Sequence, residues 1–258
     1  MSMTSQIGAA YSASATAWAA GPARLYDRLA DVLVARSPVP LSGRLALDVG
    51  SGTGAATRAL RARGAEVVAA DAAAGMIAAG PAPGVVADAR RLPFSDGAFG
   101  AAVAAFCLNH VEPPADGLRE ARRVTASGGV VLVSSYGNEL DHPVKTAVLD
   151  ALETVGYVLP PWYDAIQSGP AAALMGTQSM TAAAREADMD ADIEAVDVAF
   201  PELDAADLVA WRLGMAHTAP FVARLDPAVR EDVVDRALEM LGEPPTLVRR
   251  IIVLTAVV

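Results

Sequence analysis

Five apolar runs, separated by helical or turn-forming stretches, occupy the first half of this chain. They span residues 45–49, 65–71, 83–89, 99–108 and 128–136. Strands that are apolar throughout and alternate with helices are typical of a parallel sheet covered on both faces. In such a sheet, ligands bind at the carboxyl ends of the strands. The alternation therefore predicts an α/β fold with its ligand site at that edge.

The pattern changes after Tyr136. Residues 137–176 are rich in prolines and aromatics and show no strand signal, whereas "IEAVDVAF" (193–200) and "LVRRIIVLTAVV" (247–258) are strand-like. A helix is predicted over 177–187, and two more over 203–241. One of these two carries the following side chains: Trp211, Leu213, Met215 and His217.

These elements add up to one domain over residues 1–258. The predicted fold is a doubly wound, mostly parallel, seven-stranded sheet with helices on both faces. Insertions at 137–176 and 201–246 are predicted to form a mainly helical substrate cap over the ligand edge.

Composition narrows the function classes. The 258 residues are 53% hydrophobic and 19% charged, which argues against disorder, and the net charge of −10 gives no basic footprint for nucleic acid. Cys107 is the single cysteine, which fits a reducing compartment. We found neither a signal peptide nor a membrane-spanning stretch, so the sequence predicts a cytoplasmic protein that acts on a small molecule. A homodimer is an open option.

The turn after the first strand carries the most specific pattern, "LDVGSGTG". Glycines at 50, 52 and 54 exceed what one tight turn needs and leave bare backbone for a ligand. Gly50-x-Gly52-x-x-Ala55, with Asp71 21 residues beyond Gly50, also satisfies a relaxed dinucleotide fingerprint. Asp48, however, puts negative charge where a pyrophosphate would sit badly and a cationic amino acid well. An NAD-dependent oxidoreductase is therefore the less favoured alternative.

Five blocks resemble, in order and spacing, those of class I S-adenosylmethionine-dependent methyltransferases. The blocks are "LDVGSGTG", "VVAADAAAGMI", "VADARRLPFSDGAFG", "FCLNHVEPP" and "RVTASGGVVLVSSY". The resemblance is strongest to the small-molecule branch that includes the ubiquinone and menaquinone methyltransferases, and it covers residues 11–136. Ala72 and Gly100 depart from the usual residues of that branch without removing a charge that the cofactor needs.

The resemblance implies a set of S-adenosylmethionine-binding residues. Asp48 would lie beneath the ammonium, Asp71 would hold the ribose, and helices within residues 1–40 would cover the cofactor. The remaining implied contacts are Gly50, Gly52 and Gly54 with the methionine portion, Met76 with the adenine face, Asp88 and Ala89 with the adenine edge, Phe106 through its backbone, and Tyr11 as a closing residue.

Each assignment has a structural alternative. Asp71 and Asp88 could be helix N-caps, Met76 a core residue, and Tyr11 an aromatic that docks its helix.

His110, just past the fourth strand, is the candidate general base, because its ordinary pKa lies near neutrality. It could instead cap the following helix. His217 is more typical of a packed side chain. Trp162, Tyr163 and Trp211 could line a flat substrate or pack in the core.

We expect no metal. Asp141 and His142, with Glu112, match no usual ligand spacing.

The sequence thus predicts methyl transfer from S-adenosylmethionine to O, N or C of an aromatic or polyketide-like small molecule. The alternative within the same family is a cofactor-binding protein that catalyses a non-methylating reaction such as cyclisation, or that acts as a sensor.

Overall fold

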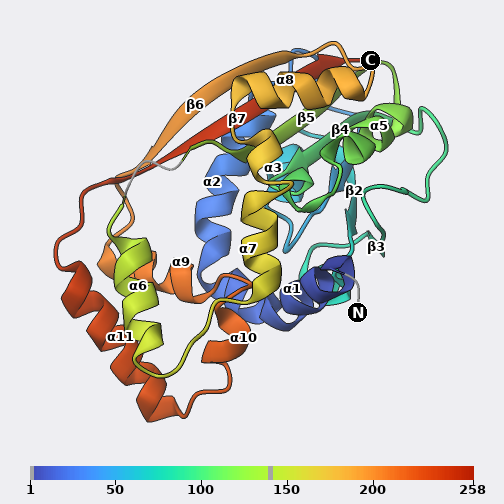
Figure 1. Cartoon of the computed structure of the whole chain (residues 1–258). Helices are drawn as coiled ribbons and strands as arrows, with labels where there is room; N and C mark the ends of the chain where they lie inside the picture. The colour runs from blue at the N-terminus through green and yellow to red at the C-terminus, as the bar shows by residue number, and fades with distance from the viewer. Residues whose placement is uncertain (1–2, 139–141) are drawn as a thin grey trace.

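A seven-stranded sheet forms the centre of the molecule, as predicted. The computed structural model describes residues 3–138 and 142–258, and its strand order is β3-β2-β1-β4-β5-β7-β6 (Figure 1). The strands are β1 (Leu45–Val49), β2 (Glu66–Asp71), β3 (Gly84–Val86), β4 (Phe99–Ala105), β5 (Thr125–Tyr136), β6 (Asp192–Phe200) and β7 (Leu247–Val257). The first five are parallel, and β7 runs antiparallel to both β5 and β6.

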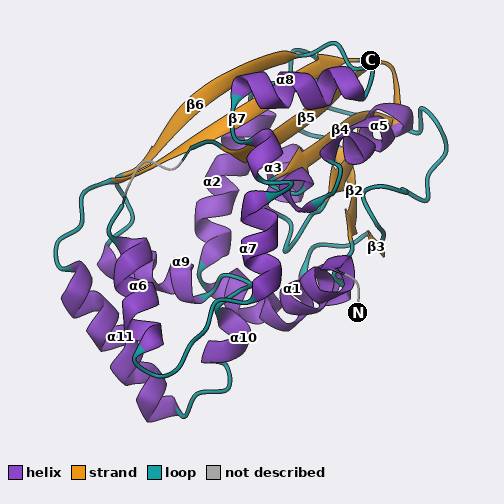
Figure 2. Cartoon of the chain, viewed as in Figure 1, coloured by secondary structure: helices purple, strands orange, loops and turns teal. Residues whose placement is uncertain are grey.

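Helices cover both faces of the sheet. On one face, Leu25, Leu29 and Leu33 of α2 are fully buried, as their spacing of four residues along one helical face predicts. This face also holds α3, and the opposite face holds α5 and α8 (Figure 2). The helices of this part are α1 (Met3–Ala20), α2 (Pro22–Val34), α3 (Ala55–Ala62), α4 (Ala74–Ala79), α5 (Pro114–Val124) and α8 (Thr177–Glu186).

The two predicted insertions are mainly helical, and they pack on one another through α6, α9 and α11. Their elements are α6 (Val144–Glu153), α7 (Pro161–Ser168), the 3-10 turn η2 (Ala172–Leu174), α9 (Ala205–Leu213), α10 (Ala219–Val222) and α11 (Pro227–Leu241). The sequence predicted only two helices over 203–241. The structure has three there, because α9 ends at Leu213 and leaves Met215 and His217 in the following turn.

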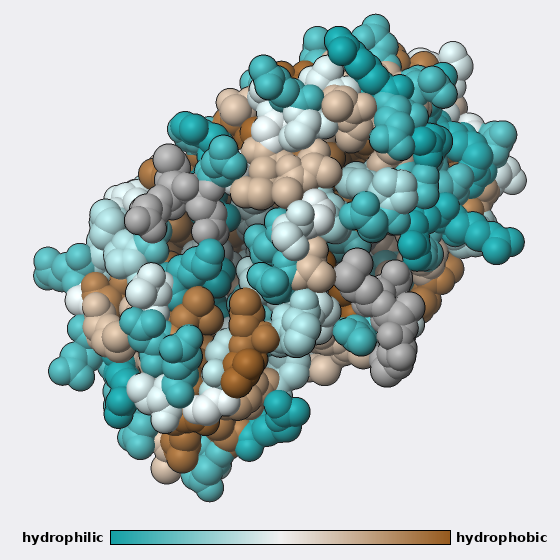
Figure 3. Space-filling view, in the orientation of Figure 1, coloured by the Kyte–Doolittle hydropathy of each residue, from teal (hydrophilic) through white to brown (hydrophobic). Residues whose placement is uncertain are grey.

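The surface over α6, α10 and α11 shows small patches of apolar residues, coloured brown, among polar residues (Figure 3). The large apolar side chains exposed on the whole molecule include Val158 and Leu159, which lie between α6 and α7.

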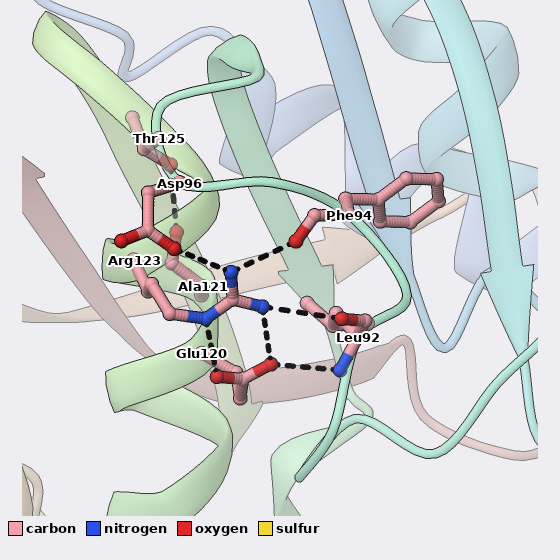
Figure 4. Close-up of polar contacts among 7 residues, drawn as sticks. All are labelled: Leu92, Phe94, Asp96, Glu120, Ala121, Arg123 and Thr125. Atoms are coloured by element: carbon pink, nitrogen blue, oxygen red, sulfur yellow. Dashed lines mark hydrogen bonds and ion pairs between the residues drawn. The ribbon is translucent and has the colours of Figure 1, made fainter.

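An ion-pair network fixes the connection between β3 and β4. Arg123 of α5 pairs with Glu120 and Asp96 and donates to the backbone carbonyls of Leu92 and Phe94 (Figure 4). Glu120 in turn accepts a hydrogen bond from the Leu92 amide at 2.7 Å. Because the carboxylate and guanidinium are partly buried and hydrogen-bonded at several points, the network holds this loop in place. The same loop begins with residues of the candidate site.

Candidate functional site

A cavity that opens to solvent lies at the carboxyl ends of β1, β2 and β4. Nine of the predicted site residues line it: Tyr11, Gly50, Gly52, Asp71, Met76, Asp88, Ala89, Phe106 and His110. Parallel pairing of β1 with β2 and with β4 brings these segments to one edge. Two predicted residues, Asp48 and Gly54, do not line the cavity.

The three glycines of the turn have different roles. Gly50 has a φ of 66°, and a Cβ there would lie 2.2 Å from the Cys107 sulfur. Gly52 has a φ of 53°, and a Cβ there would meet no atom within 4 Å, so its backbone faces open space. Gly54 begins α3 with a φ of 93°, and its Cβ would lie 2.3 Å from Pro81. Gly54 does not line the cavity, and its backbone conformation forms the turn into α3, so its contact with the cofactor stays a prediction.

Asp48 is almost completely buried beneath the turn. Its Oδ2 accepts a hydrogen bond of 2.6 Å from the Thr57 hydroxyl, but its Oδ1 has no hydrogen-bond partner among the described residues. Burial raises the pKa of Asp48 to about 6, although the Thr57 hydrogen bond opposes the shift. A buried carboxylate oxygen without a donor needs an explanation, and a ligand cation above it would supply one.

Asp71 ends β2 and connects two loops. Its Oδ2 accepts from the Gly52 amide at 2.8 Å and its Oδ1 from the Ala73 amide at 2.7 Å. Burial raises its pKa, and these two amides limit the rise. Asp71 thus caps the turn before α4, which is close to the alternative role of a helix N-cap, and it also lines the cavity.

Asp88 lies farther out and pairs with Arg90 through bonds of 2.6–3.2 Å. This hydrogen bonding lowers the pKa of Asp88. The pair leaves Asp88 partly exposed at the cavity wall, so any contact with the adenine edge must share its carboxylate with Arg90.

Apolar residues form the rest of the wall. Met76 is fully buried yet lines the cavity, and Ala89 is nearly buried.

Phe106 has a φ of 56°, unusual for a residue with a side chain, and its amide donates to the Ser134 carbonyl at 3.0 Å. Strained backbone of this kind often marks functional sites.

His110 and Tyr11 contact each other in the lining of the cavity. The Tyr11 hydroxyl lies 3.0 Å from Nε2 of His110, and Nδ1 of His110 is buried without a partner among the described residues. Burial lowers the pKa of His110 to about 4, rather than leaving it near neutrality as expected from the residue type. The imidazole is therefore neutral at pH 7.

A second cavity adjoins the first. Tyr11, Tyr26, Phe106 and His110 line both. The second cavity also contacts α7, the turn after α9, and β7. Trp162, Tyr163 and Trp211 all line it, and Trp211 also belongs to the buried hydrophobic core. His217 stacks on Tyr163 with ring centroids 4.0 Å apart.

Sequence reasoning missed an aromatic cluster between the two cavities. Trp18 and Tyr26 line the first cavity, their rings are 4.8 Å apart, and Tyr26 contacts both Phe106 and Tyr136 edge-on. The spacing of Tyr11 and Trp18, seven residues apart on one helix, was the available signal.

Asp141, His142 and Glu112 are the residues considered as possible metal ligands. Asp141 lies outside the described residues, and His142 Nε2 lies 3.0 Å from the Pro245 carbonyl oxygen. Within residues 3–138 and 142–258, no group of three His, Cys, Asp or Glu side chains is placed to hold a metal ion. In the same part of the chain, no helix combines the length and apolar character needed to cross a bilayer.

Residues 47–133 match the family described as "Methyltransferase domain". Demethylmenaquinone methyltransferase of Mycolicibacterium vanbaalenii is 38% identical over 152 residues, which is 58% of this chain and 65% of that protein. The Mycobacterium tuberculosis enzyme of the same name is 39% identical over 133 residues, covering 50% of this chain and 56% of the relative. The aligned part thus spans less than two thirds of these relatives.

Solved structures share the fold at low identity. A methyltransferase described as part of an antibiotic biosynthesis pathway in Anabaena variabilis superimposes with a TM-score of 0.58 at 15% identity, over 88% of this chain and 96% of that one. Phosphoethanolamine N-methyltransferase 2 of Haemonchus contortus gives 0.55 at 16%, over 89% of this chain and 52% of that one. These structural matches confirm the predicted fold. The family match over residues 47–133 and the demethylmenaquinone methyltransferase relatives confirm the predicted resemblance to class I S-adenosylmethionine-dependent methyltransferases.

Proposed function

We propose that this chain transfers a methyl group from S-adenosylmethionine in the first cavity to a small-molecule acceptor in the second. One observation carries the proposal. The open backbone at Gly52 lies at the turn above Asp48, whose Oδ1 is buried without a hydrogen-bond partner among the described residues. This arrangement suits a ligand that bears an ammonium group.

The residues present fit the cofactor. The backbone at Gly50 and Gly52 would contact its amino-acid end, and Asp48, buried beneath the turn and outside the cavity lining, would attract its ammonium group without touching it. Asp71 would accept hydrogen bonds from the ribose hydroxyls. Met76 and Ala89 would contact the adenine, with Asp88 at its edge. When bound, S-adenosylmethionine supplies a methyl group already activated by a sulfonium, so the protein has to align the acceptor and manage its proton.

His110 is placed for that proton. It lines both cavities, and it is neutral, so that one ring nitrogen can accept a hydrogen bond or a proton from the acceptor. Its lowered pKa makes it a weaker base than an exposed imidazole. Tyr11, 3.0 Å from Nε2, would orient the ring. The helices of residues 137–176 and 201–246 would form the cap over the acceptor, and α1 and α2 would cover the cofactor.

Relatives named demethylmenaquinone methyltransferases support a flat aromatic acceptor, and the aromatic lining of the second cavity is compatible with one. A cytoplasmic location and a homodimer belong to the same proposal as predictions from the sequence.

Calorimetric titration with S-adenosylmethionine, S-adenosylhomocysteine and NAD tests the cofactor. We expect micromolar binding of the first two and none of NAD. Micromolar NAD binding without a response to S-adenosylmethionine would overturn the proposal.

The non-methylating alternative deserves one measurement of its own. The cyclase SpnF shares the fold with a TM-score of 0.53 at 20% identity. With a converted substrate in hand, release of S-adenosylhomocysteine in step with product identifies a methyltransferase, whereas conversion without it identifies the alternative.

A further inference from the structure

Positive charge gathers in the second cavity of an otherwise acidic protein. Lys145, the only lysine in a chain of net charge −10, lines this cavity together with Arg212 and Arg249. Lys145 and Arg249 take part in interactions of their own, which leaves Arg212 as the cation considered for a ligand. The three cations come from α6, α9 and β7, so only the fold brings them together.

Arg212 is the most informative of the three. Its residue is 6% exposed, its Nε has no hydrogen-bond partner, and it forms no ion pair with a carboxylate in the described part of the chain. Its guanidinium lies 5.3 Å from the centroid of the Trp211 ring. That contact stabilises the face of the cation, but the N–H donors lie in the guanidinium plane and still require acceptors. A buried charge without such acceptors is costly, so a ligand anion is the natural partner.

His217, Tyr163 and Arg249 line the cavity beside Arg212. Burial, together with the charges of Arg212 and Lys145, lowers the pKa of His217 to about 3. His217 is therefore neutral and does not compete for an anion. Its stacking on Tyr163, with planes 23° apart, gives the cavity a flat wall beside the cations. Arg249 lies over the Tyr136 ring at 4.4 Å.

We propose that the acceptor is an aromatic oxyanion, a carboxylate or phosphate on a flat ring, whose anionic group binds the Arg212 guanidinium. This inference rests on the proposed function, because it assigns the second cavity to the acceptor. A guanidinium presents paired N–H donors that match the two oxygens of a carboxylate or phosphate. The ring of the acceptor would lie along Tyr163 and reach toward His110, which lines the same cavity.

Binding of three probes to the whole chain, with S-adenosylhomocysteine present, tests the inference. The probes are benzoate, phenyl phosphate and the neutral benzamide, measured by calorimetry. At least one anion should bind about tenfold or more tightly than benzamide, since hydrogen bonds to charged groups are the strong ones. The better anion identifies the oxyanion. Equal binding of all three, or none, while S-adenosylhomocysteine binds, overturns this inference alone. Failure of S-adenosylhomocysteine to bind overturns the proposed function instead, and the acceptor assignment with it.

A charge-removing variant adds a second test. Arg212→Met keeps much of the side-chain volume, and Arg236→Met, at an exposed position of α11, is the matched control. The favoured anion should raise the melting temperature of the parent and of Arg236→Met but not of Arg212→Met. The affinity for S-adenosylhomocysteine should stay within about threefold, below the tenfold loss expected of a lost charged hydrogen bond. A tenfold loss would assign Arg212 to the cofactor carboxylate and overturn the proposal, as would unchanged anion binding.

Discussion

The Tyr11 hydroxyl lies 3.0 Å from Nε2 of His110, although 99 positions separate the two residues in the chain. Tyr11 belongs to α1, and His110 ends the 3-10 turn that follows β4. Both side chains line both cavities. The pair therefore stands where a cofactor in one cavity and an acceptor in the other would meet.

Replacing His110 should slow the chemistry more than it weakens cofactor binding. General-base assistance contributes about 10²–10⁴-fold, so His110→Gln should lower the methylation rate about a hundredfold or more. Its affinity for S-adenosylhomocysteine should match that of the parent. Rates on the identified acceptor and calorimetry check this, with His142→Gln as the control. An unchanged rate would leave His110 with the structural role of holding Tyr11.

The stability of the fold should depend on His110 at acidic pH. Because the folded-state pKa of about 4 lies below the ordinary 6.5, the unfolded chain binds more protons between these values. This group's contribution to stability is therefore lost as the pH falls from 6.5 toward 4, by on the order of 3 kcal/mol in total. Asp48, with its pKa raised to about 6, acts in the opposite direction over much of this range.

Comparison of the parent with His110→Gln cancels the Asp48 contribution. Urea unfolding at pH 7 and pH 4.5 should show that the parent loses more stability than the variant. Parallel losses in both proteins would mean that His110 titrates near its ordinary pKa.

Alanine at Gly52 and at Gly54 should have different effects. A Cβ at Gly54 meets Pro81 at 2.3 Å with a φ of 93°, so Gly54→Ala should lower the melting temperature markedly. At Gly52 a Cβ meets nothing within 4 Å, so only the strain of its φ of 53° lowers stability, by roughly 1 kcal/mol. Gly52→Ala should instead lose S-adenosylhomocysteine affinity, because the methyl group occupies ligand space. Thermal melts and calorimetry on both variants separate the effects, and normal ligand affinity in Gly52→Ala would argue against a ligand there.

Asp71→Asn tests the ribose contact while retaining the size of the side chain. The loss of charge-assisted hydrogen bonds worth roughly 1.5–3 kcal/mol should weaken S-adenosylhomocysteine binding about ten- to a hundredfold. Asp27→Asn, at a partly exposed carboxylate paired with Arg58, serves as the control. Parent-like binding in Asp71→Asn would reduce Asp71 to a cap of the loop before α4.

The cap proposal predicts a pattern of hydrogen exchange. Residues of α7 and of the turn after α9 line the second cavity, whereas β4 and β5 lie in the buried centre of the sheet. In the free protein, amides of α7 should exchange faster than those of β4, and cofactor plus acceptor should slow them. Full protection of α7 without ligand would indicate that it is simply part of the core.

Much of the sheet could be predicted from the sequence, because each buried parallel strand consists of a short run of consecutive apolar residues. The first strand was predicted at 45–49 and is found at Leu45–Val49. The third was predicted at 83–89 but covers only Gly84–Val86, because Ala87 and Asp88 already turn toward the cavity. The glycine turn with Asp48 and Asp71 was likewise visible, since its residues lie at the ends of adjacent predicted strands.

The tertiary structure decided what depends on burial and on packing between distant segments. The residue type of His110 suggests a group that titrates near neutrality, but the packing of α1 over it lowers its pKa. Gly54 belongs to the glycine motif, but in the fold it packs against Pro81 and forms the start of α3. Lys145, Arg212 and Arg249 are isolated cations in the sequence, and they share a cavity only because α6, α9 and β7 converge. Local composition specifies the strands and the turn, whereas the desolvation and proximity that set the chemistry of a side chain exist only once the chain has folded.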